Sequence, residues 1–145
     1  MNKHRSIISA VLLGAALPVS TAFAEGKLIV EFAGMASDAG VIVCSLVDSR
    51  EQFLSSGHQP LRDASLVITD ARASWHIDKL AFGSYAISAY HDANSNAELD
   101  TGLFGIPNED YGFSNNARGT FGPPDFTDAI FEFNQSGQAL TIRID

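Results

Sequence analysis

The chain has 145 residues, of which 17 are acidic and 9 are basic, and 46% are hydrophobic. The hydrophobic fraction is too high for a disordered chain, and the acidic balance excludes binding of nucleic acid or of an anionic membrane surface through the net electric field. A chain of this charge is suited to binding cations.

The first 24 residues have the pattern of a secretory signal peptide. Lys3 and Arg5 give a positive start, residues 7–17 are apolar, and residues 22–24 form a small-x-small cleavage site. The alternative, a retained membrane anchor, needs a longer apolar stretch. We therefore expect a periplasmic or secreted protein without a membrane span, with residues 25–145 as one domain. Loss of the two basic residues leaves 7 basic against 17 acidic residues, a formal charge of −10.

Short apolar stretches follow in chain order, and turn-forming residues separate most of them. Residues 27–32 alternate like a strand, whereas residues 41–47 are apolar on both faces, which predicts a central strand covered on both sides. Residues 49–54 are predicted to form a short helical turn. The remaining predicted strands are residues 65–69, 73–78, 84–91, 129–133 and 140–144.

This strand pattern predicts an all-β fold. About seven short strands without an amphipathic helix favour a single antiparallel β-sandwich of immunoglobulin or prealbumin type. The alternation places Trp75 and Ile77 inward, and gives Tyr85, Ile87 and His91 a shared face. The single cysteine, Cys44, lies in an apolar strand, so we expect it to be buried and inert rather than reactive, and no internal disulfide is possible.

A ladder of oxygen-bearing side chains follows the strand at residues 84–91. Its members, at every second position, are Asp92, Asn94, Asn96, Glu98 and Asp100. The first three match the first ligand positions of a calcium loop, with the backbone carbonyl of Glu98 and the side chain of Asp100 as later ligands. The ladder therefore predicts a site for Ca²⁺ or a similar hard cation.

Two departures separate this ladder from a helix-loop-helix calcium site. Ala97 stands where glycine normally provides a positive φ, at a cost of about 1 kcal/mol. Leu103 replaces the usual bidentate glutamate, so the missing oxygens would come from Glu109, Asp110 or the backbone. The alternative is that Asp92 and its neighbours make Asx turns that satisfy the backbone of a tight bend.

Residues 100–127 form one long loop that is rich in glycine, proline and aromatic residues. It holds five of the 12 glycines and three of the 5 prolines, together with Phe104, Tyr111, Phe113, Phe121 and Phe126. A loop of this length is usually functional or tightly packed on itself. We expect either a lid over one end of the sandwich or an exposed aromatic surface for a glycan, peptide or protein.

The histidines and serines do not form a recognisable catalytic arrangement. His58 and His76 lie at no ligand-like spacing, which disfavours zinc, and no serine lies in a nucleophile-elbow context. We expect His91 to be a core histidine that bonds the overlying loop rather than a transition-metal ligand. An enzyme acting on an envelope glycan or small molecule remains the alternative, with acid and base among His91, Asp92, Glu109 and Asp110.

Several motifs resemble an exported bacterial family catalogued as domain of unknown function 2141. They are His91-Asp92-x-Asn94-x-Asn96, Leu99-Asp100, Gly105-Ile106-Pro107-x-Glu109-x-Tyr111-Gly112-Phe113-Ser114-Asn115-Asn116, Pro124-x-Phe126-x-x-Ala129-x-Phe131 and the strand at Tyr85. The resemblance covers essentially the whole chain after the signal peptide. It implies a small exported all-β domain and supplies no activity. Ala97 departs from it, because the family motif usually has glycine there.

Together these patterns predict an exported, non-enzymatic binding or structural module with a calcium-like loop at residues 92–100. His91, Glu109, Tyr111, Phe113, Asn115 and Asn116 are expected to form a ligand surface or to pack the long loop. The partner would be an envelope protein or a glycan, and a structural role in an envelope assembly is a third possibility.

Overall fold

The computed structural model describes residues 24–145 and contains eight strands, so the expected signal peptide lies outside the described residues except for Ala24. Three single helical turns, η1 (Leu103–Gly105), η2 (Ser114–Asn116) and α1 (Phe126–Ala129), occur in the second half of the chain. The strands are β1 (Glu25–Ala33), β2 (Val41–Val47), β3 (Arg62–Val67), β4 (Arg72–Ala81), β5 (Gly83–Asp92), β6 (Tyr111–Phe113), β7 (Phe131–Phe133) and β8 (Gln138–Arg143).

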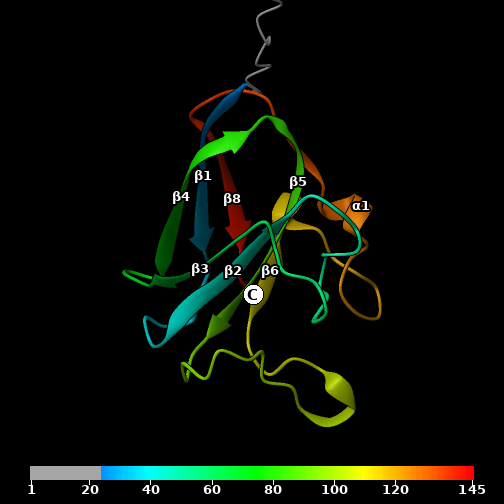
Figure 1. Cartoon of the computed structure of the whole chain (residues 1–145). Coiled ribbons are helices and arrows are strands. Elements are labelled where there is room, and N and C mark those ends of the chain that lie inside the picture. Colours follow the sequence, from blue (N-terminus) through cyan, green and yellow to red (C-terminus); the bar gives the residue numbers. More distant parts are fainter. Residues whose placement is uncertain (1–23) are drawn as a thin grey trace, which may run out of the picture.

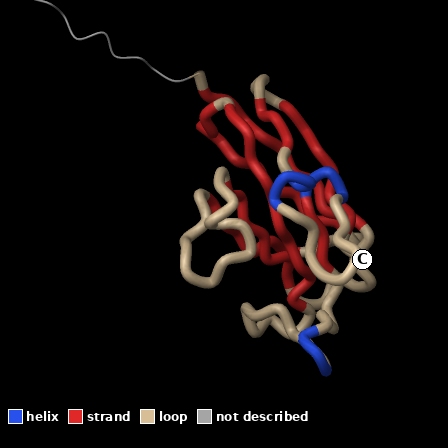
Figure 2. Tube along the Cα trace, turned by 90° about the vertical axis from the view of Figure 1, so that its right-hand side faces the viewer, coloured by secondary structure: helices blue, strands red, loops and turns tan. Residues whose placement is uncertain are grey.

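The strands form two sheets that make a sandwich (Figures 1 and 2). The smaller sheet has the order β4-β1-β8. The larger sheet has the order β3-β2-β5-β6, and β7 pairs with the first part of β5. The chain passes from the smaller sheet to the larger one at Phe82, between β4 and β5. The predicted all-β sandwich is therefore confirmed.

One pairing corrects the expectation of a wholly antiparallel sandwich, because β1 and β8 run parallel. The chain enters β8 from β7 in the other sheet, and the turn between them lies at the start of β1. Gly137 N–H donates to the Lys27 carbonyl oxygen at 2.7 Å, and Lys27 N–H donates to Ser136 Oγ at 3.0 Å. The two strands therefore start at the same end of the sheet.

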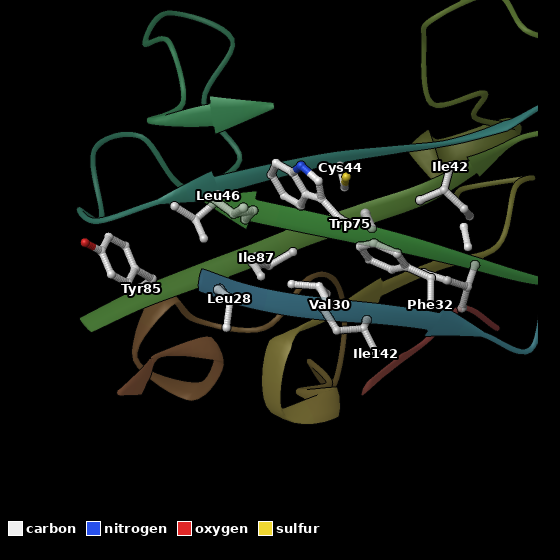
Figure 3. Close-up of a cluster of buried hydrophobic side chains, with 14 of the residues drawn as sticks. Leu28, Val30, Phe32, Ile42, Cys44, Leu46, Trp75, Tyr85, Ile87 and Ile142 are labelled. Atoms are coloured by element: carbon white, nitrogen blue, oxygen red, sulfur yellow. The ribbon is translucent and has the colours of Figure 1, made fainter. Parts of the chain in front are cut away.

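The core lies between the two sheets, and the alternating residues of each strand fill it (Figure 3). Leu28, Val30 and Phe32 of β1 are fully buried, as their spacing predicts. Cys44 is buried as expected, and burial raises the pKa of its thiol to about 12. Each large side chain removed from water in this core contributes about 1.5–3 kcal/mol to stability.

A second, smaller cluster covers one end of the larger sheet on its outer face, which is the face turned away from the smaller sheet. We call it the outer cluster. Val47, Ala86, Phe113 and Ala129 are buried in it, and Phe53, Tyr111, Ala117 and Phe126 pack around them. Because this cover reaches only one end of β2, the expectation of a strand buried on both faces holds at Val47 and fails at the half-buried Val41 and Val43.

The short helical turn expected at residues 49–54 is present, because Phe53 N–H donates to the Ser49 carbonyl oxygen at 3.3 Å. Two other local expectations are corrected. Ala129 ends α1 instead of opening a strand. The long loop contains β6, which is too short to show an alternating pattern in the sequence and pairs with β5 only through the tertiary fold.

Candidate functional site

The residues on the outer face of β5 differ in burial along the strand. Ala86 lies under the outer cluster, Ser88 and Tyr90 are half-buried, and Asp92 is buried at the end of the strand. The intervening residues Ile87 and His91 point into the core, as the alternation predicts. One strand thus connects the outer cluster to the oxygen ladder, across an open stretch between them.

The oxygen ladder, residues 92–100, is a closed polar loop in which carboxylates accept backbone N–H groups. Both oxygens of Asp92 are engaged: Oδ1 accepts Asn96 N–H at 3.0 Å, and Oδ2 accepts Ala97 N–H at 2.8 Å. The Asp92 side chain is almost completely buried. A buried carboxylate costs free energy unless such donors surround it, so these bonds hold the turn against the end of β5.

The amide side chains complete the polar loop. Asn94 Nδ2 donates to Asp100 Oδ2 at 2.7 Å, and Asn96 Nδ2 donates to Asp100 Oδ1 at 3.0 Å. The amide oxygens of Asn94 and Asn96 accept backbone N–H groups two residues further on, which is the pattern of Asx turns. The side-chain oxygens at alternate positions therefore accept the backbone N–H groups of this bend, which have no backbone acceptor within the described residues.

Glu109 ties the polar loop to the chain that returns toward β6. Its Oε1 accepts Ala93 N–H and its Oε2 accepts Asp100 N–H, both at 3.0 Å. One carboxylate thus fixes both ends of the bend. A partner for these N–H groups could not be assigned from spacing, because Glu109 is 16 residues from Ala93 in the sequence.

Ala97 adopts a φ of 62°, the conformation for which glycine is preferred. The chain thus takes the positive φ of the calcium-loop position at Ala97, although alanine replaces the usual glycine. The N–H groups of Asn96 and Ala97 meet the two oxygens of Asp92 in this bend, so the strained residue belongs to the anchored part of the loop.

The ladder's oxygens are brought together only in part. Within residues 24–145, no three His, Cys, Asp or Glu side chains gather as a metal-binding group. Asp100 is reached by two amide groups and Asp92 by two backbone N–H groups, whereas Glu98 is exposed. A cation at Asp100 would compete with the amide groups of Asn94 and Asn96 for its oxygens. Calcium binding stays a prediction.

The residues considered above as a general acid or base, His91, Asp92, Glu109 and Asp110, make hydrogen bonds within the fold. His91 is buried, and its Nε2 bonds the Ala39 carbonyl oxygen at 2.6 Å, so this nitrogen carries the proton. Glu109 and Asp92 each accept two backbone N–H groups. Asp110 is half-buried, and its carbonyl oxygen accepts His91 N–H at 2.8 Å.

Residues 100–108 form a small hairpin, which we call the apolar hairpin. Asn108 N–H donates to the Asp100 carbonyl oxygen at 2.8 Å, Thr101 bridges Pro107, and Gly102 N–H donates to the Ile106 carbonyl oxygen at 2.7 Å. Its tip, η1, projects from the end of the sandwich where β5 ends (Figure 1). Leu103, Phe104 and Ile106 at the tip are 84%, 98% and 64% exposed.

A pocket of about 760 Å³ lies between the apolar hairpin and the outer cluster. Its volume is in the range of sites that bind small organic ligands. Every lining residue is uncharged, and most are apolar. They include Ser88 and Tyr90 of β5, Tyr111 and Phe113 of β6, Leu99, Phe104, Ile106 and Pro107 around the hairpin, and Leu54, Phe121 and Pro123 from neighbouring loops.

Tyr90 lines the pocket and lies two residues before Asp92, where the polar loop begins. Burial raises the pKa of its hydroxyl group, and the negative charges of Asp92, Glu109 and Glu98 raise this pKa further. The polar loop therefore places a negative potential at the Tyr90 end of the pocket.

The Ser114-Asn115-Asn116 motif fastens the segment after β6. The buried Ser114 Oγ accepts Ile87 N–H at 2.9 Å and donates to the Ala129 carbonyl oxygen. Asn115 Nδ2 donates to the carbonyl oxygens of Asp128 and Ile130. Asn116 Oδ1 accepts Arg143 N–H at 2.8 Å from β8. These two asparagines, expected as a ligand or loop-packing surface, make packing contacts.

The remaining expected surface residues, Tyr111 and Phe113, pack with the outer cluster and also line the pocket. Gly112 between them is required, because a Cβ there would collide with the carbonyl oxygen of Arg143. Sequence reasoning missed Leu54, Ser88 and Ile106 as pocket residues. The available signal was the run of apolar residues at positions 103–106 within a polar loop.

The comparisons with known proteins give a family and nothing more specific. The model of the family described as "Uncharacterized protein conserved in bacteria (DUF2141)" matches residues 30–141. Neither the comparison with curated proteins nor that with solved structures found a match. In the part of the chain that the structure describes, no helix is long and apolar enough to cross a membrane.

Proposed function

The chain belongs to the DUF2141 family, and from this premise we propose that it is an exported, non-enzymatic module that binds a partner in the pocket beside the apolar hairpin. The polar loop and the Ser114 motif are the scaffold of this site. The bonds of Asp92 and Glu109 tie the base of the apolar hairpin to the end of β5, and those of Ser114 tie the segment after β6 to β5.

The exposure of the aromatic residues at the pocket rim carries the proposal. Phe104 is 98% exposed and Phe121 is 102% exposed, although both line one pocket. Contiguous exposed apolar groups around a concave site are typical of surfaces that bind a ligand or partner. The other aromatic residues of the same segment, such as Phe113, are buried.

The backbone at the hairpin tip supports the same function. Phe104 has a φ of 64°, which costs a non-glycine residue about 1–2 kcal/mol. Residues held in such conformations concentrate at ligand contacts. An exposed phenylalanine in this conformation contributes nothing to the core, so a binding role accounts for it better than a packing role.

The engagement of the carboxylates supports a non-enzymatic role. Glycoside hydrolysis requires one carboxyl group to donate a proton and a second carboxylate to act as base or nucleophile. Asp92 and Glu109 have both oxygens committed to backbone N–H groups. The surface pocket beside them is lined by uncharged residues.

A calcium-like cation at the polar loop is a further part of this proposal. The ion would bind Asp100 and the asparagine oxygens in place of the amide-carboxylate bonds. It would then hold the base of the apolar hairpin, because Asp100 also accepts Asn108 N–H through its carbonyl oxygen. Calcium would in that case order the partner site rather than take part in a reaction.

Nile red, an uncharged apolar dye that fluoresces on leaving water, tests the pocket. We expect it to bind the mature protein and to lose at least about tenfold in affinity in the double variant Phe104→Ser, Phe121→Ser, because two apolar rim groups are removed. Val67→Ser is the matched control, since Val67 is 78% exposed on β3 and does not line the pocket. Equal binding by the wild type and the rim variant would refute the proposal.

A further inference from the structure

We infer that the occupant of the pocket is a polypeptide segment that carries basic side chains among apolar ones, with a positive charge placed at the Tyr90 end beside the polar loop. This inference rests on the proposed function, because it names the class of partner for the same pocket.

The distribution of charge along the chain provides the first argument. Residues 80–117 contain Asp92, Glu98, Asp100, Glu109 and Asp110 but no lysine or arginine. This range includes β5, the polar loop, the apolar hairpin and the return to β6. The basic residues that flank the pocket segments are already paired, Arg50 with Asp125 and Arg118 with Asp145. The field around the pocket is therefore negative.

The placement of the carboxylates provides the second argument. Leu99 and Thr101 line the pocket and alternate in sequence with Glu98 and Asp100. Glu109 bonds the backbone of Asp100 and so lies at the same end. A lysine or arginine of the partner could reach this rim while its apolar neighbours contact Phe104 and Ile106. Complementary charge at a rim selects the partner and speeds association.

The extent of the exposed apolar surface favours a polypeptide over a small molecule. Leu103 is 84% exposed and lies next to Phe104 but outside the pocket lining. Phe104 and Phe121 protrude almost fully into solvent. A ligand confined to the pocket would leave Leu103 in water, whereas a chain segment with several side chains could cover it together with Phe104 and Phe121.

The test compares short labelled peptides that share Phe and Leu at alternate positions and carry Lys, Ser or Glu between them. Fluorescence anisotropy measures their affinity for the mature protein. We expect the Lys peptide to bind about tenfold more tightly than the Glu peptide, with Ser between them. This preference should shrink as NaCl is raised from about 50 mM to about 500 mM, because salt screens the rim charges.

A charge variant separates the rim from the rest of the acidic surface. Glu98→Gln removes an exposed charge, and the bond that residue 98 makes to Asn96 uses its backbone N–H. We expect it to reduce the Lys-peptide affinity about threefold or more. Glu25→Gln removes one exposed charge at the first residue of β1 and should leave the affinity unchanged. In Figure 1, β1 begins at the end of the sandwich opposite the apolar hairpin.

The outcomes distinguish the two proposals. If Nile red binds but the Lys, Ser and Glu peptides bind equally, the pocket is real and the basic partner is wrong. If none of the peptides binds while decyltrimethylammonium displaces Nile red, the occupant is a small cationic amphiphile and the polypeptide is wrong. If Nile red fails to bind at the pocket, the proposed function itself is wrong.

Discussion

The two halves of the glycine- and aromatic-rich segment, residues 100–108 and 111–129, differ in which apolar residues they bury, although Phe121 in the second half is exposed like Phe104 in the first. In the second half, Phe113 and Ala129 are buried in the outer cluster. In the first half, Phe104 and Ile106 face solvent. The sequence predicts one loop over residues 100–127, as either a lid or an exposed aromatic surface, and a strand that begins at Ala129.

The difference lies in what holds each half in place. The second half is fastened by apolar packing and by Ser114, which bonds both β5 and α1. Hydrogen bonds from Asp100 and Glu109 hold the base of the first half. The apolar side chains at its tip are therefore not needed to hold it in place. A segment anchored by polar groups leaves its apolar side chains free to contact a partner, whereas Phe113 and Ala129 are occupied by the packing that anchors their own segment.

The largest expected effect is a difference in unfolding free energy between variants in the two halves. Phe113→Ala should lower the free energy of unfolding by about 3–5 kcal/mol, because it opens a cavity in the outer cluster. Phe104→Ala should change it by less than about 0.5 kcal/mol, as expected for an exposed side chain. Urea denaturation of both variants measures the contrast. A similar loss in both would mean that the hairpin tip is packed.

Calcium should act on the polar anchor of the first half. After chelation, a specific calcium site would raise the unfolding free energy by about 2.7 kcal/mol when the ion is at a hundredfold excess over Kd. Asp100→Asn should abolish this rise, because it removes the charged ligand while keeping an oxygen. Thermal unfolding with calcium, and with magnesium as the comparison ion, measures it. An unchanged melting temperature would leave the polar loop as a turn held by its own hydrogen bonds.

The smallest expected effect concerns the strained bend in the same anchor. Ala97→Gly should stabilise the protein by about 0.5–1 kcal/mol, since glycine adopts the φ of 62° at little cost. Ala93→Gly is the matched control in the same loop. Ala93 is not among the residues with positive φ, so this change should destabilise by a similar amount. If both variants lost stability in urea, the bend would not be strained at residue 97.

The strands were predictable where one face is buried. Leu28, Val30 and Phe32 alternate because every second residue of β1 meets the core, and Tyr85, Ile87 and His91 do the same in β5. The parallel pairing of β1 with β8 was not predictable, because it depends on the route of the chain between the sheets. β6 was missed for a similar reason, since three residues are too few to show a period.

The candidate site was predictable only as separate pieces. The spacing of Asp92, Asn94 and Asn96 predicted either a calcium loop or a tight bend made by Asx turns, and the Asx-turn hydrogen bonds are present. The sequence could not show that Glu109 closes the bend, or that Leu54 and Phe121 share a pocket with Ser88. These contacts join residues that are far apart along the chain.

By itself the sequence determined the all-β class, the inward faces of the strands and the local bend at residues 92–97, because each follows from a short period or from neighbouring side chains. Only the tertiary structure decided which aromatic residues are buried. Phe113 and Phe104 are both phenylalanines beside glycines in one segment. β5 and Phe53 lie over the first of them, and only solvent lies over the second.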